Sequence, residues 1–161
     1  MLFCDKKLMS CLFQSLSNSV VQCEIQTLRN KICDYLAGNP KLADLGNCEE
    51  VLILLQDESM PIPLDNYVEN MRHAHTMGGA IEIMCFVQMF KTNVVVIDKR
   101  SGHKMEFHYF QDYTIDVVSQ DKETSGDSTT VLQNTSLQNT ASENVIHLNW
   151  NGGHFDRCVV L

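Results

Sequence analysis

The last ten residues, GGHFDRCVVL, place a histidine and an aspartate two positions apart in a mainly apolar segment. Side chains at positions i and i+2 of a β-strand point to the same face, so we expect His154 and Asp156 to lie side by side. A carboxylate beside an imidazole can orient the ring for proton transfer. The same spacing also produces hydrogen-bonded pairs on protein surfaces, which have no catalytic role.

A cysteine near the other end of the chain could supply the nucleophile for such a pair. In CLFQSLSNSV, Leu12, Phe13 and Leu16 recur at helical spacing, which predicts a helix that begins at or just before Cys11. The dipole and free N–H groups of a helix N-terminus favour a thiolate, and the same N–H groups can stabilise an oxyanion. The alternative for Cys11 is a packing role, because free cysteine is among the most buried residue types.

Further helices are expected to follow Cys11 and make up the front half of the chain. One of them has Ile25, Leu28, Ile32 and Leu36 on a single face and ends at a glycine and a proline. Apolar spacing and turn residues predict helices within 23–40, 48–57, 65–73 and 78–90.

The back half changes to the period of β-strands. Strands are expected at 93–98, 103–110, 144–150 and 154–161, with turns at 99–102 and 151–153. The segment between them at 119–143 is too polar to bury a core face and predicts a mobile loop. We therefore expect one domain over 1–161 of the α+β class. Its helical front half packs on a small, mainly antiparallel sheet made from 93–118 and 144–161.

Composition limits the class of protein. The chain has 161 residues, a net charge of −8 and seven cysteines without CxxC or zinc-finger spacing, which favours a reducing compartment, cytoplasmic or also nuclear. No apolar run is long enough for a transmembrane helix, and charged residues interrupt the N-terminal segment where a signal peptide has its apolar core. We expect a monomer that binds neither membranes nor nucleic acid and whose acidic surface suits a basic or neutral protein partner.

Three segments, in this order along the chain, resemble the ovarian tumour (OTU) family of cysteine proteases, which remove ubiquitin or ubiquitin-like proteins. CLFQSLS at 11–17 is similar to the block around the family's nucleophile. Between this first segment and the second, LRNKICDYLAGNP at 28–40 resembles the helix that follows the nucleophile. YVENMRHAHTMGGAIEIMCFVQMFKTNVVVID at 67–98 looks like a later block with a double glycine, a glutamate, a helix and a buried strand. HFD at 154–156 is similar to the terminal His-aromatic-Asp/Asn motif. The resemblance implies an OTU-like fold of the papain-like class over all of the chain except 119–143.

The resemblance also implies a reaction. Carried over residue by residue, it makes Cys11 the nucleophile, His154 the general base and then acid, and Asp156 the group that orients the imidazole. Asn149 and Asn151 are weaker candidates for that orienting role. The implied activity is that of a thiol-dependent isopeptidase that attacks the bond between a ubiquitin C-terminal glycine and a lysine.

Other residues would serve the reaction without taking part in its chemistry. The resemblance implies oxyanion donors at the backbone N–H groups of Met9, Ser10 and Cys11. Trp150 and Gly153 are candidates for lining a channel for the Gly-Gly tail, although Trp150 is equally suited to packing. Three residues of the second block, Gly78, Gly79 and Glu82, are expected to shape the core behind the site.

The loop before the nucleophile leaves a second function open. The family usually has Asp-Gly-x-Cys, and this chain has Leu8, Met9, Ser10 and Cys11. The alternative is a catalytically weak or inactive OTU-like module that binds ubiquitin or another protein without cleaving it. The two alternatives differ in whether N–H groups converge beside Cys11 and whether His154 reaches the sulfur.

A metal site is a third, less favoured interpretation. His73 and His75 have an H-x-H spacing, with His103 and His108 as further candidates, but their side chains diverge at a helix end and no cysteine or carboxylate cluster completes a tetrahedron. We therefore expect neither a metal nor another cofactor.

Overall fold

The computed structural model describes residues 10–19, 23–57, 59–110 and 145–158. The loop expected at 119–143 and the oxyanion candidate Met9 lie outside the described residues. The helices and strands confirm an α+β architecture, with helices in the front half of the chain and strands in the back half.

Five α-helices and one short 3₁₀ helix precede the sheet in the part of the chain that the structure describes. They are α1 (Cys11–Ser17), α2 (Ile25–Ala37), the 3₁₀ helix Ala43–Leu45, α3 (Cys48–Leu55), α4 (Leu64–Met71) and α5 (Ala80–Phe90). The apolar spacing that predicts α2 is explained by burial, since Leu28, Ile32 and Leu36 are fully enclosed. A capping box starts α3, where Asn47 Oδ1 accepts the Glu50 N–H and the Glu50 carboxylate accepts the Asn47 N–H.

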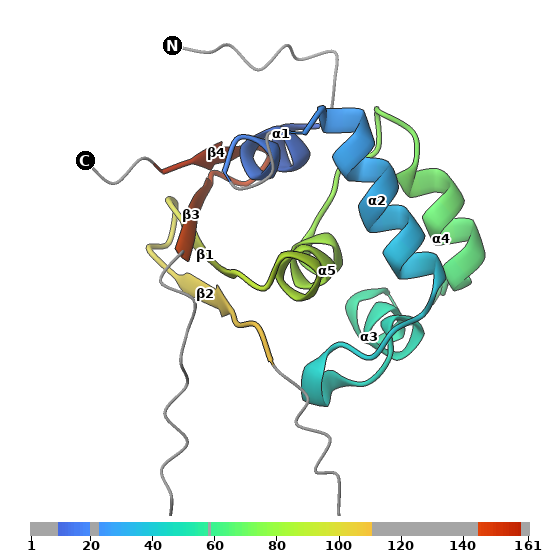
Figure 1. Ribbon diagram of the computed structural model, residues 1–161. Coiled ribbons are helices and arrows are strands. Elements are labelled where there is room, and N and C mark those ends of the chain that lie inside the picture. The colour runs from blue at the N-terminus through green and yellow to red at the C-terminus, as the bar shows by residue number, and fades with distance from the viewer. Residues whose placement is uncertain (1–9, 20–22, 58, 111–144, 159–161) are drawn as a thin grey trace, which may run out of the picture.

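Four strands form one mixed sheet in the order β2-β1-β3-β4. They are β1 (Asn93–Asp98), β2 (Lys104–Phe107), β3 (Val145–Trp150) and β4 (Phe155–Arg157). The β1–β2 and β3–β4 pairs are antiparallel hairpins, as expected from the turns at 99–102 and 151–153. The central β1–β3 pair is parallel, with Val94 opposite Ile146 and Val96 opposite Leu148. The parallel pairing turns the terminal hairpin so that β4 is an edge strand beside α1 (Figure 1).

Helices α1 and α5 pack on the sheet, and α2 joins them to α4. Helix α1 packs against β4, and α5 packs against β1 and β2. Helix α2 contacts α1, α4 and α5, so it lies between α4 and the two helices that pack on the sheet (Figure 1). The core contains Phe13 and Leu16 from α1, Phe86 from α5 and Leu148 from β3, all of them fully enclosed. The nucleophile candidate is thus on a short helix fixed by both the sheet and α2.

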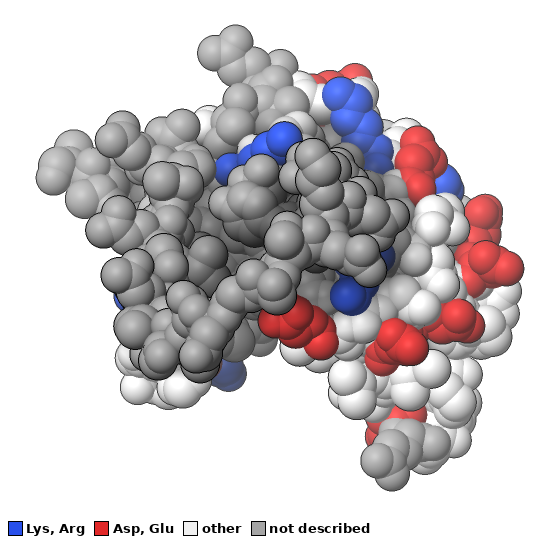
Figure 2. Space-filling model, turned by 60° about the horizontal axis from the view of Figure 1, so that its bottom comes forward, with Lys and Arg blue, Asp and Glu red and all other residues white. Residues whose placement is uncertain are grey.

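The surface over α3 and α4 is acidic. Figure 2 shows Asp and Glu side chains spread over this side of the molecule, and Glu49, Glu50, Asp65 and Glu69 are all exposed there. No helix within the described ranges has both the length and the apolar composition needed to cross a lipid bilayer.

Candidate active site

Cys11 contacts the backbone of Phe155 where α1 packs on β4. The Phe155 N–H donates to Cys11 Sγ at 3.5 Å, and the Ser15 hydroxyl donates to the Phe155 carbonyl oxygen at 3.3 Å. Cys11 and Ser15 are four residues apart, so they lie on the same face of α1. The peptide bond between His154 and Phe155 therefore directs its N–H towards the start of α1, where Cys11 lies.

His154 and Asp156 form a hydrogen-bonded pair. His154 Nε2 lies 2.8 Å from Asp156 Oδ1, and the two residues flank Phe155, the first residue of β4. When Nε2–H donates to the carboxylate, the neutral imidazole has its lone pair on Nδ1. The His154 side chain is 31% exposed and that of Asp156 56%, so both are accessible to solvent. This arrangement leaves Nδ1 chemically able to accept a proton.

The backbone before Cys11 is fixed by neighbouring segments. Ser10 stands at the N-cap of α1, but its side chain caps no N–H of the helix. Its hydroxyl donates instead to the Ala74 carbonyl oxygen at 3.0 Å and accepts from Arg29 Nη2 at 3.0 Å. Ser10 and Cys11 are 6% and 4% exposed, so the nucleophile candidate is buried.

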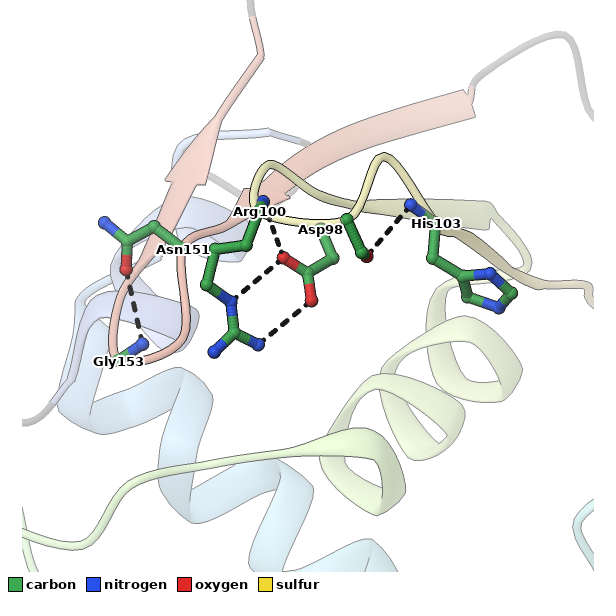
Figure 3. A network of polar contacts seen from close by, with 6 residues as sticks. Asp98, Arg100, His103, Asn151 and Gly153 are labelled. Atoms are coloured by element: carbon green, nitrogen blue, oxygen red, sulfur yellow. Dashed lines mark hydrogen bonds and ion pairs between the residues drawn. The ribbon is translucent and has the colours of Figure 1, made fainter.

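The turn that carries His154 lies against the neighbouring β1–β2 turn. The Gly153 N–H donates to Asn151 Oδ1 at 3.3 Å, and the Asn151 N–H donates to the His154 carbonyl oxygen at 3.2 Å. Arg100 pairs with Asp98 through Nε and Nη2 at 3.2 and 3.0 Å, and its guanidinium lies beside Gly152 (Figure 3). Hydrogen bonds from the Arg100 side chain and backbone N–H lower the pKa of Asp98 to about 2, so this carboxylate is ionised at neutral pH.

Gly152 and Gly153 provide a matched test of this turn. Gly152 has a φ of +94°, and a Cβ added to it would lie 2.5 Å from Arg100 Nη1, whereas a Cβ on Gly153 would meet nothing within 4 Å. We expect Gly152→Ala to reduce the free energy of unfolding by about 1–2 kcal/mol, because a side chain strains this left-handed backbone. Gly153→Ala should change it by less than about 0.5 kcal/mol. Urea denaturation of both variants measures the difference, and equal losses would contradict this account of the turn.

The comparison with family models decides the family. The model for the OTU-like cysteine proteases matches residues 10–155, which extend from the N-cap of α1 to the start of β4. This chain belongs to the OTU-like cysteine protease family. The match includes Cys11, the double glycine and His154, and it confirms the family predicted from the three ordered segments.

Solved OTU structures have the same fold. An OTU domain solved in complex with ubiquitin has a TM-score of 0.59 and 17% identity, and the match covers 98% of this chain and 66% of the other. An OTU deubiquitinase from Wolbachia pipientis wMel bound to ubiquitin has a TM-score of 0.56 and 16% identity, with 94% and 90% covered. The viral OTU domain protease from Dera Ghazi Khan virus has a TM-score of 0.54 and 13% identity, with 94% and 74% covered. The search of curated proteins found no match.

The double glycine of this OTU chain lies directly against α1, the helix that begins at Cys11. A Cβ on Gly78 would be 2.8 Å from Phe13 Cε2 and 2.9 Å from Leu12 Cδ2, so only glycine allows this close approach to α1. The Gly79 N–H donates to the buried Glu82 carboxylate at 2.6 Å, and the Tyr67 hydroxyl donates to the same carboxylate at 2.8 Å. Burial raises the pKa of Glu82, and these two donors oppose that rise. These contacts fix the start of α5 behind the site.

The two glycines should differ in their tolerance of a side chain. We expect Gly78→Ala to cost about 1–3 kcal/mol of unfolding free energy, because the new methyl group overpacks against α1. Gly79→Ala meets no atom closer than Glu82 Oε2 at 4.0 Å, and its cost should stay below about 1 kcal/mol, the usual penalty of alanine at an N-cap. Thermal and urea denaturation compare the two, and a larger loss for Gly79→Ala would contradict the packing argument.

The remaining sequence candidates lie around the β3–β4 hairpin. Trp150 is half-buried and packs on Phe155 with ring centroids 4.5 Å apart, which favours its packing role. Gly153 is exposed at the turn. The Asn149 amide donates to Cys158 Sγ and Asn151 Oδ1 accepts within its own turn, so the carboxylate on the His154 imidazole is that of Asp156. Among the described residues, no three His, Cys, Asp or Glu side chains gather closely enough to hold a metal.

The sequence analysis missed Arg29, a residue of α2 that is buried between several segments of this OTU chain. Arg29 is fully buried and contacts α1, the end of α4 and the segment before α5. A signal was present in the sequence, because Arg29 is four residues after Ile25 and three before Ile32, on the apolar face of α2. A charged residue at such a position requires partners in the core.

Proposed function

We propose that this chain is a thiol-dependent isopeptidase that hydrolyses the bond after the C-terminal glycine of ubiquitin or a ubiquitin-like protein. The observation that carries the proposal is the hydrogen bond from the Phe155 N–H to Cys11 Sγ. It brings the nucleophile candidate to the backbone of the His154–Asp156 pair. A cysteine, a histidine and an orienting carboxylate are the parts that this reaction requires.

The proposed reaction has two steps. His154 Nδ1 accepts the Cys11 thiol proton while Sγ bonds to the carbonyl carbon of the terminal glycine, and negative charge develops on the carbonyl oxygen. The backbone N–H groups of Ser10 and Cys11 are the proposed donors to that oxygen. The C–N bond then breaks, the lysine amine takes the proton from His154, and a thioester remains on Cys11. Water activated by His154 attacks the thioester, which releases a free carboxylate and restores the thiol.

Two features support a ubiquitin-type protein as the substrate. Two structures with the same fold are described as an OTU domain in complex with ubiquitin and an OTU deubiquitinase bound to ubiquitin. The net charge of −8 and the acidic side over α3 and α4 suit a protein partner with basic surfaces and oppose the phosphates of nucleic acid (Figure 2).

The experiment is hydrolysis of ubiquitin that carries a C-terminal aminomethylcoumarin amide, together with matched substrates made from ubiquitin-like proteins. We expect coumarin release from at least one of them, and we expect prior treatment with iodoacetamide to remove the activity. Binding of ubiquitin measured by calorimetry without any hydrolysis would contradict the proposal and favour a binding module.

A further inference from the structure

Arg29 is a buried cation with several partners close to the nucleophile. Its guanidinium donates from Nη1 to the carbonyl oxygens of Met71 and Thr76, both at 2.9 Å, and from Nη2 to Ser10 Oγ at 3.0 Å and the Ala74 carbonyl oxygen at 3.4 Å. The residue has no exposed surface. A buried charge is costly unless such partners compensate it, so the packing of this layer depends on these contacts.

The contact with Ser10 replaces the usual role of a serine at a helix start. A serine at the N-cap normally accepts an N–H from its own helix, whereas Ser10 forms a closed triangle with Arg29 Nη2 and the Ala74 carbonyl oxygen. The position of Ser10 is therefore set by α2 and the segment before α5. Because Cys11 follows directly, its Cα is placed by the same contacts.

The guanidinium also contacts the chain that follows Cys11, as it contacts Ser10 before it. Arg29 Cζ lies 4.0 Å from the centroid of the Phe13 ring, a cation–π contact with the residue two positions after Cys11. Burial lowers the pKa of Arg29, and negative charge on Cys33, Glu82 and Cys11 acts in the opposite direction. A thiolate at Cys11 and the Arg29 cation therefore attract each other.

We propose that Arg29 is a positioning residue for the nucleophile. By fixing Ser10 on one side of Cys11 and Phe13 on the other, it sets the place at which the thiol meets the His154 backbone. The proposal rests on the proposed function of Cys11 as the nucleophile. Arg29 touches neither the substrate nor the reacting atoms, and it acts through the backbone that carries Cys11.

The test removes one hydroxyl group from the triangle. Ser10→Ala deletes one of the two acceptors of Arg29 Nη2 that the described residues provide. Ser17→Ala is the matched control, since Ser17 is a buried serine of α1 whose hydroxyl donates to the Gln14 carbonyl oxygen. We expect Ser10→Ala to lower kcat by about 10- to 100-fold with little change in KM, because a small displacement of the nucleophile slows chemistry more than binding. Ser17→Ala should retain kcat within about twofold.

A second variant and a correction for folding keep the result interpretable. Arg29→Lys retains the charge but not the planar fork of donors, so it should lower kcat like Ser10→Ala. The rates are divided by the fraction of folded protein, measured by far-UV circular dichroism, which removes any effect of misfolded protein. Equal kcat for Ser10→Ala and Ser17→Ala, or a rise in KM alone, would overturn the proposal.

An NMR measurement separates this proposal from the proposed function. The backbone amide signal of Phe155 reports its hydrogen bond to Cys11 Sγ and requires no substrate. We expect Ser10→Ala to shift this signal more than Ser17→Ala does. If the wild-type chain hydrolyses no substrate, the proposed function fails, while a shifted Phe155 signal would still support the positioning of Cys11 by Arg29 and Ser10. An unshifted signal would overturn it.

Discussion

Replacement of Cys11 by alanine is expected to abolish hydrolysis of the ubiquitin substrate while leaving ubiquitin binding unchanged. Without Sγ there is no thioester, and loss of the nucleophile of such a triad lowers kcat on the order of 10⁴-fold or more. Cys11 is 4% exposed and its side chain is small, so replacement by alanine leaves only a small cavity and little change in the surface available to ubiquitin. The expected result is therefore a loss of rate without a comparable loss of affinity.

Coumarin release and calorimetric titration with ubiquitin measure the two quantities separately. Cys23→Ala is the matched control, because Cys23 is partly exposed and its thiol donates to the carbonyl oxygen of its neighbour Glu24. It should retain the wild-type rate within about twofold. Residual hydrolysis by Cys11→Ala at a rate near that of the wild type would place the nucleophile elsewhere and contradict the assignment of Cys11.

Replacement of His154 by alanine is expected to lower kcat by about 10²- to 10⁴-fold, the range that general acid–base catalysis contributes. In the proposed reaction the imidazole takes the thiol proton, returns it to the leaving amine and activates water. Removal of its partner should cost less, since the Asp156 side chain is 56% exposed and only orients the ring. We expect Asp156→Ala to lower kcat by about 10- to 100-fold.

A conservative variant tests what Asp156 contributes. Asp156→Asn keeps an oxygen acceptor for His154 Nε2–H, so it should retain more activity than Asp156→Ala. Asn149→Ala is the control for the neighbouring strand, because Asn149 pairs with Asp156 across the β3–β4 hairpin and its amide bonds Cys158 instead. Steady-state rates for the four variants give the order. A larger loss for Asn149→Ala than for Asp156→Ala would contradict the orienting role of the carboxylate.

Elements with strong periodicity and clear end signals were predictable from the sequence. Leu28, Ile32 and Leu36 repeat every four residues and are all fully buried in α2. The period-2 pattern and turn residues indicated both hairpins, and the i, i+2 spacing placed His154 beside Asp156. These features depend on local geometry, which a short stretch of sequence determines.

Long-range features were not predictable in the same way. The parallel pairing of β1 with β3 joins segments some fifty residues apart in the chain and leaves no local pattern. Likewise, a serine before a helix indicates an N-cap, and only the presence of Arg29 and the Ala74 carbonyl oxygen explains why Ser10 bonds elsewhere. The sequence therefore predicted the helix that begins at Cys11, but it did not predict the contacts that fix the start of this helix.

The most direct test of the account is incubation with ubiquitin that carries a C-terminal thiol-reactive group, followed by intact mass measurement and peptide mapping. The account predicts an adduct of one ubiquitin attached to Cys11, absent from Cys11→Ala and slow to form with His154→Ala. Ubiquitin binding without any adduct, or an adduct on another cysteine, would contradict it.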